Sequence, residues 1–399
     1  MPGRSISVSE QGRRAVWWLG LSQCVLWGIL YYGYSIWQEP LIQSLHVSRV
    51  QIAGAFSLGL AVMALLAPWV GRQIDNGDVQ RMVRWGLLLA VLGIVGLTLS
   101  RMLWSLYLSY ALLGAAMATL LYETAFGLVT RAVSDHRERL SALSTITIFG
   151  GLASTVFLPL LAWSTSHFGW RITGWAAIPF LIASGVLLEK AVYPYLVADE
   201  RVDQAKADAA AFEIGLPHIW AFSIVFILCT VSAMTLAVLV IPKLHAEGAS
   251  AIWAASALGV FGVAQLPGRI WLARHRSEVS ATWLTTIPLT SMLLGMIGLA
   301  VAPGLFAAFF SIALFGFGSG MMTLARPWLV QQRFGVSQAG RINGRIAKHQ
   351  GVARAMGPIG AVWLADLGHF DWVFAGFAFA ILLVLPLAGR LPAPNTAAA

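Results

Sequence analysis

The chain has 399 residues, of which 58% are hydrophobic and only 11% are charged. Soluble domains carry about 25% charged residues, so this composition argues against an ordinary soluble domain. The formal net charge of +9 could suggest nucleic-acid binding, but the sequence has no basic patch with interleaved aromatic residues, which such a role would need.

The apolar residues form twelve long runs, and a run of ~20 residues crosses the ~30 Å of bilayer hydrocarbon as a helix. The runs are continuous rather than alternating, which predicts helices and not a barrel. The first half of the chain contains runs at 15–38, 50–72, 82–100, 103–130, 140–163 and 171–193. The second half contains runs at 217–243, 249–273, 279–300, 303–332, 341–365 and 371–390.

The first run is predicted to be a retained helix and not a cleaved secretory signal. It is long, begins with Trp17 and Trp18, and is not followed by a small-residue cleavage site. A charged, alanine-rich stretch between the sixth and seventh runs predicts a solvated linker that is partly helical. We therefore expect an N-terminal six-helix bundle over 1–193, a cytoplasmic linker over 194–215, and a C-terminal six-helix bundle with a short tail over 216–399.

Landmark residues recur at a constant spacing of 202 positions, which indicates that a six-helix pattern is used twice. A duplicated six-helix bundle with both ends on one side predicts an all-α membrane transporter built from two pseudo-symmetric bundles. The matching pairs are Pro40 and Pro242, Ser48 and Ser250, Gly114 and Gly316, Arg131 and Arg333, and Arg139 and Arg341.

The basic residues indicate the orientation in the membrane. Most of the 26 Lys and Arg residues lie in the amino terminus, in the even-numbered gaps between runs, or in the carboxyl terminus. Cytoplasmic loops are enriched in Lys and Arg, so this bias predicts that both termini are cytoplasmic. The compact loops suggest a bacterial protein of the inner membrane, and we expect a monomer.

A loop motif between the second and third runs reads Gly71-Arg72-Gln73-Ile74-Asp75-Asn76-Gly77, with Arg81 and Arg84 after it. It resembles the loop signature of the major facilitator superfamily, and the resemblance extends over essentially the whole chain. In that family the acid caps a neighbouring helix and latches the lobes on the cytoplasmic side. The resemblance therefore implies a gating role for Asp75, supported by Gly71, Arg72 and Arg81.

The motif departs from the family pattern in two places, because Asn76 replaces a basic residue and Asp78 replaces a glycine. The resemblance also implies a binding site near the bilayer midplane, around which the two bundles rock. The helices of the first, fourth, seventh and tenth runs (helices 1, 4, 7 and 10) would line this site.

A few charged residues lie deep inside the apolar runs, where a charge is costly and usually faces a cavity or a partner. Glu123 is the only acid deep within a run, and Arg326 occupies the repeat-equivalent run. Arg354 lies near the middle of the eleventh run. Gln350 is one turn before Arg354, and Thr323 shares a helical face with Arg326.

We interpret these residues as a central site with two arginines for an anion and one acid for a proton. Arginine stays charged and binds carboxylate or phosphate through two parallel hydrogen bonds. Burial favours a neutral carboxyl while a nearby arginine favours the charged form, so Glu123 is a candidate for proton coupling. The substrate-binding candidates are Arg326, Arg354, Gln350, Thr323, Tyr31 and Tyr34.

Structural alternatives remain open for each of these residues. Glu123 and Arg326 can form a salt bridge that only stabilises one conformation, or a pair that only binds substrate. Arg354 can be a structural partner. The tyrosines can belong to the aromatic belt at the membrane surface.

The predicted function is secondary active transport of a small organic anion, such as a monocarboxylate, by a symporter or antiporter in which Glu123 is the candidate for proton coupling. One rival is proton-coupled efflux of drugs or other amphiphiles, although Tyr110 stands near the place where such exporters carry a buried arginine. A rival of another class is a membrane sensor that does not transport.

The sequence contains no catalytic constellation and no phosphate-cradling Gly-Lys-Ser/Thr loop, so we expect neither an enzyme nor an ATP-driven pump. The two cysteines, Cys24 and Cys229, lack metal-ligand spacing. We therefore predict no metal and no cofactor.

Overall fold

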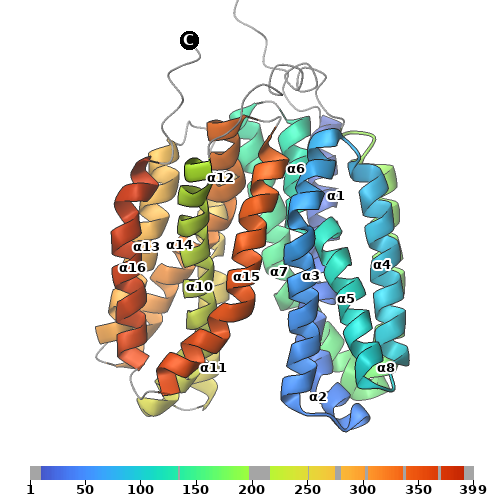
Figure 1. Ribbon diagram of the computed structural model, residues 1–399, viewed down its shortest axis with the longest axis horizontal. Coiled ribbons are helices and arrows are strands. Elements are labelled where there is room, and N and C mark those ends of the chain that lie inside the picture. Colours follow the sequence, from blue (N-terminus) through green and yellow to red (C-terminus); the bar gives the residue numbers. More distant parts are fainter. Residues whose placement is uncertain are drawn as a thin grey trace, which may run out of the picture. The chain divides into compact units, whose positions relative to one another are not determined.

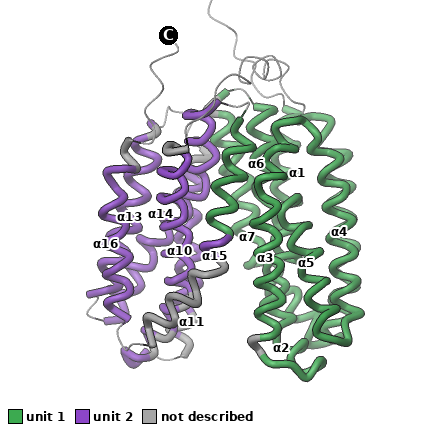
Figure 2. Tube along the Cα trace, in the orientation of Figure 1, with its two compact units in different colours: residues 1–211, 336–351 green, residues 212–335, 352–399 purple. Residues whose placement is uncertain are grey.

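The computed structural model describes residues 10–133, 135–196, 216–249, 251–274, 280–301, 304–335, 338–366 and 370–390. Within these ranges the regular elements are all helices (Figure 1). The chain divides into two compact units (Figure 2). Unit 1 contains residues 1–211 and 336–351, and unit 2 contains residues 212–335 and 352–399.

Unit 1 begins with one continuous helical stretch, in which the π-helical turn η1 joins α1 to α2. A second π-helical turn, η2, follows α8. The elements are α1 (Glu10–Leu26), η1 (Trp27–Tyr32), α2 (Gly33–Leu45), α3 (Arg49–Asn76), α4 (Val79–Leu99), α5 (Leu103–Leu120), α6 (Tyr122–Ala132), α7 (His136–Phe168), α8 (Trp170–Leu187) and η2 (Leu188–Val192).

Unit 2 contains the remaining helices, except that α15 is shared and contributes its residues up to 351 to unit 1. The elements are α10 (Leu216–Ala246), α11 (Ala251–Ala264), α12 (Leu266–Arg274), α13 (Ala281–Val301), α14 (Leu305–Phe334), α15 (Ala339–Asp366) and α16 (Phe370–Arg390). Most of the predicted linker, residues 197–215, lies outside the described residues, as does the predicted tail.

Ten helical stretches among the described residues are long and apolar enough to cross a membrane. They correspond to ten of the twelve predicted spans. The other two predicted spans, 249–273 and 341–365, coincide with α11 plus α12 and with α15. Their membrane crossing stays a prediction.

Two predicted spans differ from the continuous helices that the sequence indicated. The fourth, 103–130, is interrupted at Leu121, where the backbone is extended with φ −83° and ψ −158°. The eighth, 249–273, is divided at Gln265, between α11 and α12. Pro267 explains the second division, because proline lacks the N–H that an uninterrupted helix would use and clashes with the preceding turn.

The ends of α3 show how local sequence sets a helix boundary. Ser48 forms a capping box with Gln51, in which each side chain accepts a hydrogen bond from the other residue's backbone N–H. Gly77 ends the helix in the left-handed region with φ 86°, a conformation that glycine adopts without steric cost. The left-handed backbone at Gly77 allows the tight turn between α3 and α4.

Glycine permits close helix packing in both units at repeat-equivalent positions. A Cβ atom on Gly114 of α5 would lie 2.2 Å from the carbonyl oxygen of Gly59 in α3. A Cβ atom on Gly316 of α14 would lie 2.7 Å from the carbonyl oxygen of Phe261 in α11. Both contacts would be clashes, so a larger side chain cannot fit without moving backbone. Positions 59 and 261 are also 202 apart, and the duplicated pattern therefore extends to helix packing.

Candidate functional site

The carboxylate of Asp75, which is 5% exposed, caps the amino terminus of α15 within unit 1. Its Oδ1 accepts a hydrogen bond from the backbone N–H of Gly340 at 2.9 Å. Its Oδ2 accepts one from the N–H of Arg341 at 2.7 Å. The first N–H groups of a helix have no partner within the helix, and the helix dipole favours a negative charge there. Asp75 therefore satisfies both requirements at once.

Small residues bring the backbone of α3 against the first half of α15. A Cβ atom on Gly71 would lie 2.1 Å from the carbonyl oxygen of Gly340, and one on Gly344 would lie 2.4 Å from that of Ala67. This close approach allows the short Asp75 side chain to reach backbone N–H groups. Gly71 and Asp75 therefore both contribute to the contact between α3 and the start of α15. Their role in gating stays a prediction.

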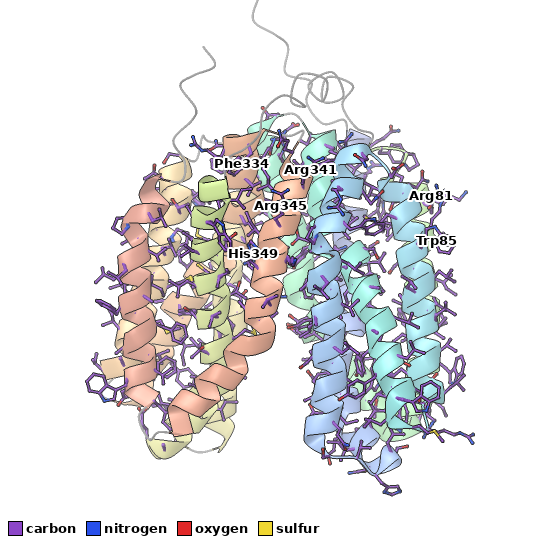
Figure 3. All side chains as sticks on the ribbon, viewed as in Figure 1. Arg81, Trp85, Phe334, Arg341, Arg345 and His349 are labelled. Carbon is purple, nitrogen blue, oxygen red and sulfur yellow. The ribbon has the colours of Figure 1, made fainter. Side chains whose placement is uncertain are left out.

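Two buried arginines that the sequence marked only as repeat landmarks hold the loops near this cap. Arg131 donates from Nη1 to the backbone oxygen of Asp75 at 2.9 Å. Arg139 donates from Nε to the carbonyl oxygen of Val133 at 2.7 Å. By contrast, Arg72 and Arg81 are exposed, and Figure 3 shows Arg81 on the outer side of α4. The two hydrogen bonds to the Asp75 carboxylate come from backbone and not from these two side chains.

The second notable feature is the interruption of the fourth span at Leu121. By residue count it lies a little past the middle of the stretch Leu103–Ala132. In lipid, backbone polar groups that leave a helix must find partners within the protein. The amide of Gln23 in α1 donates to the oxygen of Leu120 at 2.8 Å. The hydroxyl of Thr124 donates to the oxygen of Thr119 at 2.8 Å.

Gln23 was not singled out from the sequence, although it is a polar residue inside an apolar run. It is 1% exposed, and its partner lies 97 positions away. The polar residue itself was a visible signal, since polar groups within a span require partners. Its role required knowledge that α1 packs near the interruption.

Glu123 lies in the first turn of α6, directly after the interruption. It is half-buried. The N–H groups of a first helical turn and the helix dipole stabilise a carboxylate at this position. The interruption thus gives an acid at membrane depth a favourable environment. Glu123 belongs to unit 1 and Arg326 to unit 2, and a pairing between them stays a prediction.

The predicted basic residues of unit 2 lie on α14 and on the second half of α15. Arg326 is half-buried on α14, and the Thr323 hydroxyl one turn earlier donates to the oxygen of Ser319 at 3.2 Å. Arg354 is also half-buried. Its Nε is shielded from solvent and has no hydrogen-bond partner among the described residues. Gln350, one turn earlier, belongs to the part of α15 assigned to unit 1.

Basic residues follow one another along the first half of α15. Arg341, Arg345 and His349 are spaced by four residues and therefore share a helical face. Figure 3 shows them in succession along this helix. The two arginines give this face of the helix a positive charge.

Tyr31 and Tyr34 belong to a cluster of aromatic rings in unit 1. Both contact Phe56 of α3, with ring centroids 5.7 Å and 4.1 Å away. The two tyrosines are half-buried. The structure therefore brings these two predicted residues together.

Within the described part of the chain, no group of three or more His, Cys, Asp or Glu side chains could hold a metal ion. Cys24 and Cys229 are both buried and unpaired with each other.

Ten apolar helical stretches, with ionisable residues inside some of them, define a multi-pass integral membrane protein. A family model for the Major Facilitator Superfamily matches residues 16–358. The chain therefore belongs to the Major Facilitator Superfamily, and the protein is a secondary transporter rather than an enzyme.

Known proteins resemble the chain over most of its length. An "MFS-type transporter" from Gibberella moniliformis (strain M3125 / FGSC 7600) is 26% identical over 351 residues, which cover 84% of this chain and 80% of the relative. The crystal structure of the human organic anion transporter MFSD10 (TETRAN) matches with a TM-score of 0.70 and 15% identity, covering 95% of this chain and 99% of that one. The proton:xylose symporter XylE, bound to 6-bromo-6-deoxy-D-glucose, matches with a TM-score of 0.73 and 13% identity, covering 93% and 94%.

The Asp75 cap predicts that Asp75→Asn will loosen the first turn of α15. The variant loses the negative charge and one acceptor, and a charged hydrogen bond contributes about 1.5–3 kcal/mol. We expect about tenfold faster hydrogen exchange at the amides of Gly340 and Arg341, measured by mass spectrometry in detergent. Asp78→Asn is the control, because Asp78 is exposed and makes no side-chain capping bond. Unchanged exchange in Asp75→Asn would contradict the capping role.

The interruption predicts that Gln23→Leu will destabilise the protein. This change leaves the oxygen of Leu120 without its donor, and a buried unsatisfied group costs about 1–3 kcal/mol. We expect a lower apparent melting temperature in detergent. Gln43→Leu should leave it unchanged, because Gln43 is exposed on α2 and donates a long hydrogen bond of 3.4 Å to Glu39. Equal melting temperatures for the two variants would show that Gln23 does not support the interruption.

Proposed function

We propose that the protein transports a small organic anion, such as a monocarboxylate, by alternating access, and that Glu123 couples transport to protons. In this proposal Arg354 and Arg326 bind the anion, with Gln350, Thr323, Tyr31 and Tyr34 as further contacts. The protein works as a monomer in a bacterial inner membrane, with both termini in the cytoplasm, and Asp75 with Gly71, Arg72 and Arg81 gates its cytoplasmic side.

The observation that carries the proposal is the environment of Arg354. A guanidinium keeps its charge in a protein, and a buried N–H donor without an acceptor is costly. The Nε atom of Arg354 is shielded and has no hydrogen-bond partner among the described residues. A carboxylate supplies the acceptor that this donor needs, and it can bind the planar guanidinium through two parallel hydrogen bonds. An anionic substrate therefore suits this position.

The position of Glu123 supports proton coupling. Glu123 lies in the first turn of α6, directly after the interruption at Leu121, and is half-buried. Charged residues at membrane depth are also costly to retain and commonly serve proton or substrate pathways.

The solved relatives are compatible with this proposal but do not select the substrate. One of them is described as an organic anion transporter and another as a proton:xylose symporter. The same fold thus carries different solutes, so the substrate depends on the side chains of the site.

Arg354→Ala should weaken the saturable exchange of the transported acid. We would reconstitute the purified protein in proteoliposomes and measure counterflow with a panel of labelled organic acids. Loss of a charged hydrogen-bonding partner predicts a fall of about tenfold to a hundredfold in apparent affinity. Arg14→Ala is the matched control, because Arg14 is exposed and forms a surface pair with Glu10.

Two outcomes of the counterflow experiment would oppose the proposal. Exchange of no acid, with efflux of a lipophilic dye that Arg354→Ala leaves unchanged, would favour export of amphiphiles. Saturable acid exchange with an unchanged apparent affinity in Arg354→Ala would remove this residue from the site.

Glu123→Gln should separate exchange from proton-driven accumulation. Glutamine keeps the size and polarity of the side chain but cannot release a proton. We expect counterflow to continue, while accumulation driven by an imposed pH gradient and the accompanying proton flux are lost. Glu10→Gln, which changes an exposed acid, should behave like the wild type. Proton flux that continues in Glu123→Gln would assign coupling to another group.

A further inference from the structure

The π-helical turn η1 gathers three aromatic rings on one face of the first span. Trp27 contacts Tyr31 and Tyr32, with ring centroids 5.2 Å and 6.4 Å away. Tyr31 and Tyr32 contact each other at 5.3 Å. A π-helical turn holds about one residue more than an α-helical turn, so the residues four and five positions after Trp27 both lie beside it.

An ordinary α-helix would separate these rings. At 3.6 residues per turn, residues five positions apart point about 140° away from each other. Tyr32 would then leave the face that carries Trp27. The π-helical turn therefore changes which side chains share a surface, and such turns occur frequently at functional sites.

Neighbouring helices extend this cluster into a continuous aromatic row. At one end, Tyr122 of α6 contacts Trp27 at 4.8 Å and stacks on Phe126 at 5.0 Å. At the other end, Tyr31 contacts Phe56, and Tyr34 stacks on Phe56 with an interplanar angle of 6°. The aromatic row comprises Trp27, Tyr31, Tyr32, Tyr34, Phe56, Tyr110, Tyr122 and Phe126.

The position of the row separates it from an aromatic belt. Belts form where the membrane meets water. Residues 27–32 instead lie near the middle of the helical stretch Glu10–Leu45. Trp27, Tyr31, Tyr32 and Phe56 are each half-buried, so part of each of these four residues remains accessible. The row therefore offers aromatic surface at membrane depth.

Two donors within the row have no hydrogen-bond partner among the described residues. They are the indole Nε1 of Trp27 and the hydroxyl of Tyr110, both shielded from solvent. Tyr110 is 1% exposed and contacts Tyr34 and Phe56 at 6.1 Å and 5.9 Å. Buried Trp and Tyr donors normally find an acceptor, and an unmade bond is costly. Of the two, the Trp27 donor belongs to a half-buried residue, and it suits a ligand that carries an oxygen acceptor.

We propose that the aromatic row is the subsite for an aromatic ring of the substrate, with the indole N–H of Trp27 donating to an oxygen on that ligand. The inference rests on the proposed transport of an organic anion and narrows it to aromatic carboxylates. Aromatic pairs prefer offset-stacked or edge-to-face contacts at 4.5–7 Å, and these contacts stabilise binding beyond the area that they bury. A saturated ring of similar size buries area but lacks this contribution.

The test compares ligands that differ only in the ring. Benzoate and cyclohexanecarboxylate have the same charge and carbon skeleton, and we would titrate both into the purified protein by calorimetry. We expect the wild type to bind benzoate about fivefold more tightly. Tyr31→Leu should bind the two acids with about equal affinity. Tyr31→Phe keeps the ring and should keep the preference for benzoate.

Two further variants control for the loss of any aromatic ring and for misfolding of Tyr31→Leu. Trp163→Leu removes an exposed ring from a separate aromatic group near the end of α7 and should keep the fivefold preference. If Tyr31→Leu does not elute as a folded protein, Tyr34→Leu tests the same row.

An uncharged pair, benzyl alcohol and cyclohexylmethanol, distinguishes the two proposals. Binding of both acids with equal affinity in the wild type would overturn the aromatic subsite and leave anion transport standing. If neither acid binds but benzyl alcohol is preferred and Tyr31→Leu removes that preference, the subsite stands and the anion proposal fails. If neither pair shows a preference for the aromatic ring, the subsite is overturned.

Discussion

The requirement that backbone polar groups find partners inside a membrane explains the main features of unit 1. The fourth span can break at Leu121 only because side chains take over the freed carbonyl groups. Gln23 and Thr124 supply these hydrogen bonds at the oxygens of Leu120 and Thr119. Once the break is satisfied, a new helix begins within the span, and Glu123 lies in its first turn.

The same requirement acts at the amino terminus of α15. Its first N–H groups are satisfied by the carboxylate of Asp75. An acidic side chain therefore lies at the start of both helices. Asp75 caps α15, and Glu123 lies in the first turn of α6. In both cases the helix dipole stabilises the negative charge. Acids that are costly in lipid are therefore retained where the backbone compensates them.

The two halves of the chain share close helix packing at equivalent glycines, but their helices are interrupted at different positions. The close contact at Gly114 recurs at Gly316, yet α14 runs unbroken past Thr323, the position equivalent to Leu121. Unit 2 instead breaks its second span at Gln265, where Pro267 follows. Each half therefore follows the same packing rules, while the interruptions that place polar groups differ.

The sequence predicted much of the fold because its signals are local or periodic. Apolar runs identified ten spans that the structure also contains, and the spacing of 202 indicated the duplication. The Asp75 motif was recognisable because glycine and an acid occur together in a short loop. The interruption at Leu121 was missed, since no proline or glycine marks it and its main support comes from Gln23, 97 positions away. The π-helical turn was missed because an extra residue in one turn leaves no trace in hydrophobic periodicity.

If Glu123 couples transport to protons as proposed, the interruption beside it faces a water-accessible path. Glu123→Cys, labelled in membrane vesicles of both orientations with a small charged thiol reagent, tests this directly. We expect rapid labelling in at least one orientation, and no labelling of Leu108→Cys, which replaces an exposed apolar residue on α5. The native Cys24 and Cys229 are buried and serve as the background. Absence of labelling at position 123 in both orientations would show that no such path reaches Glu123.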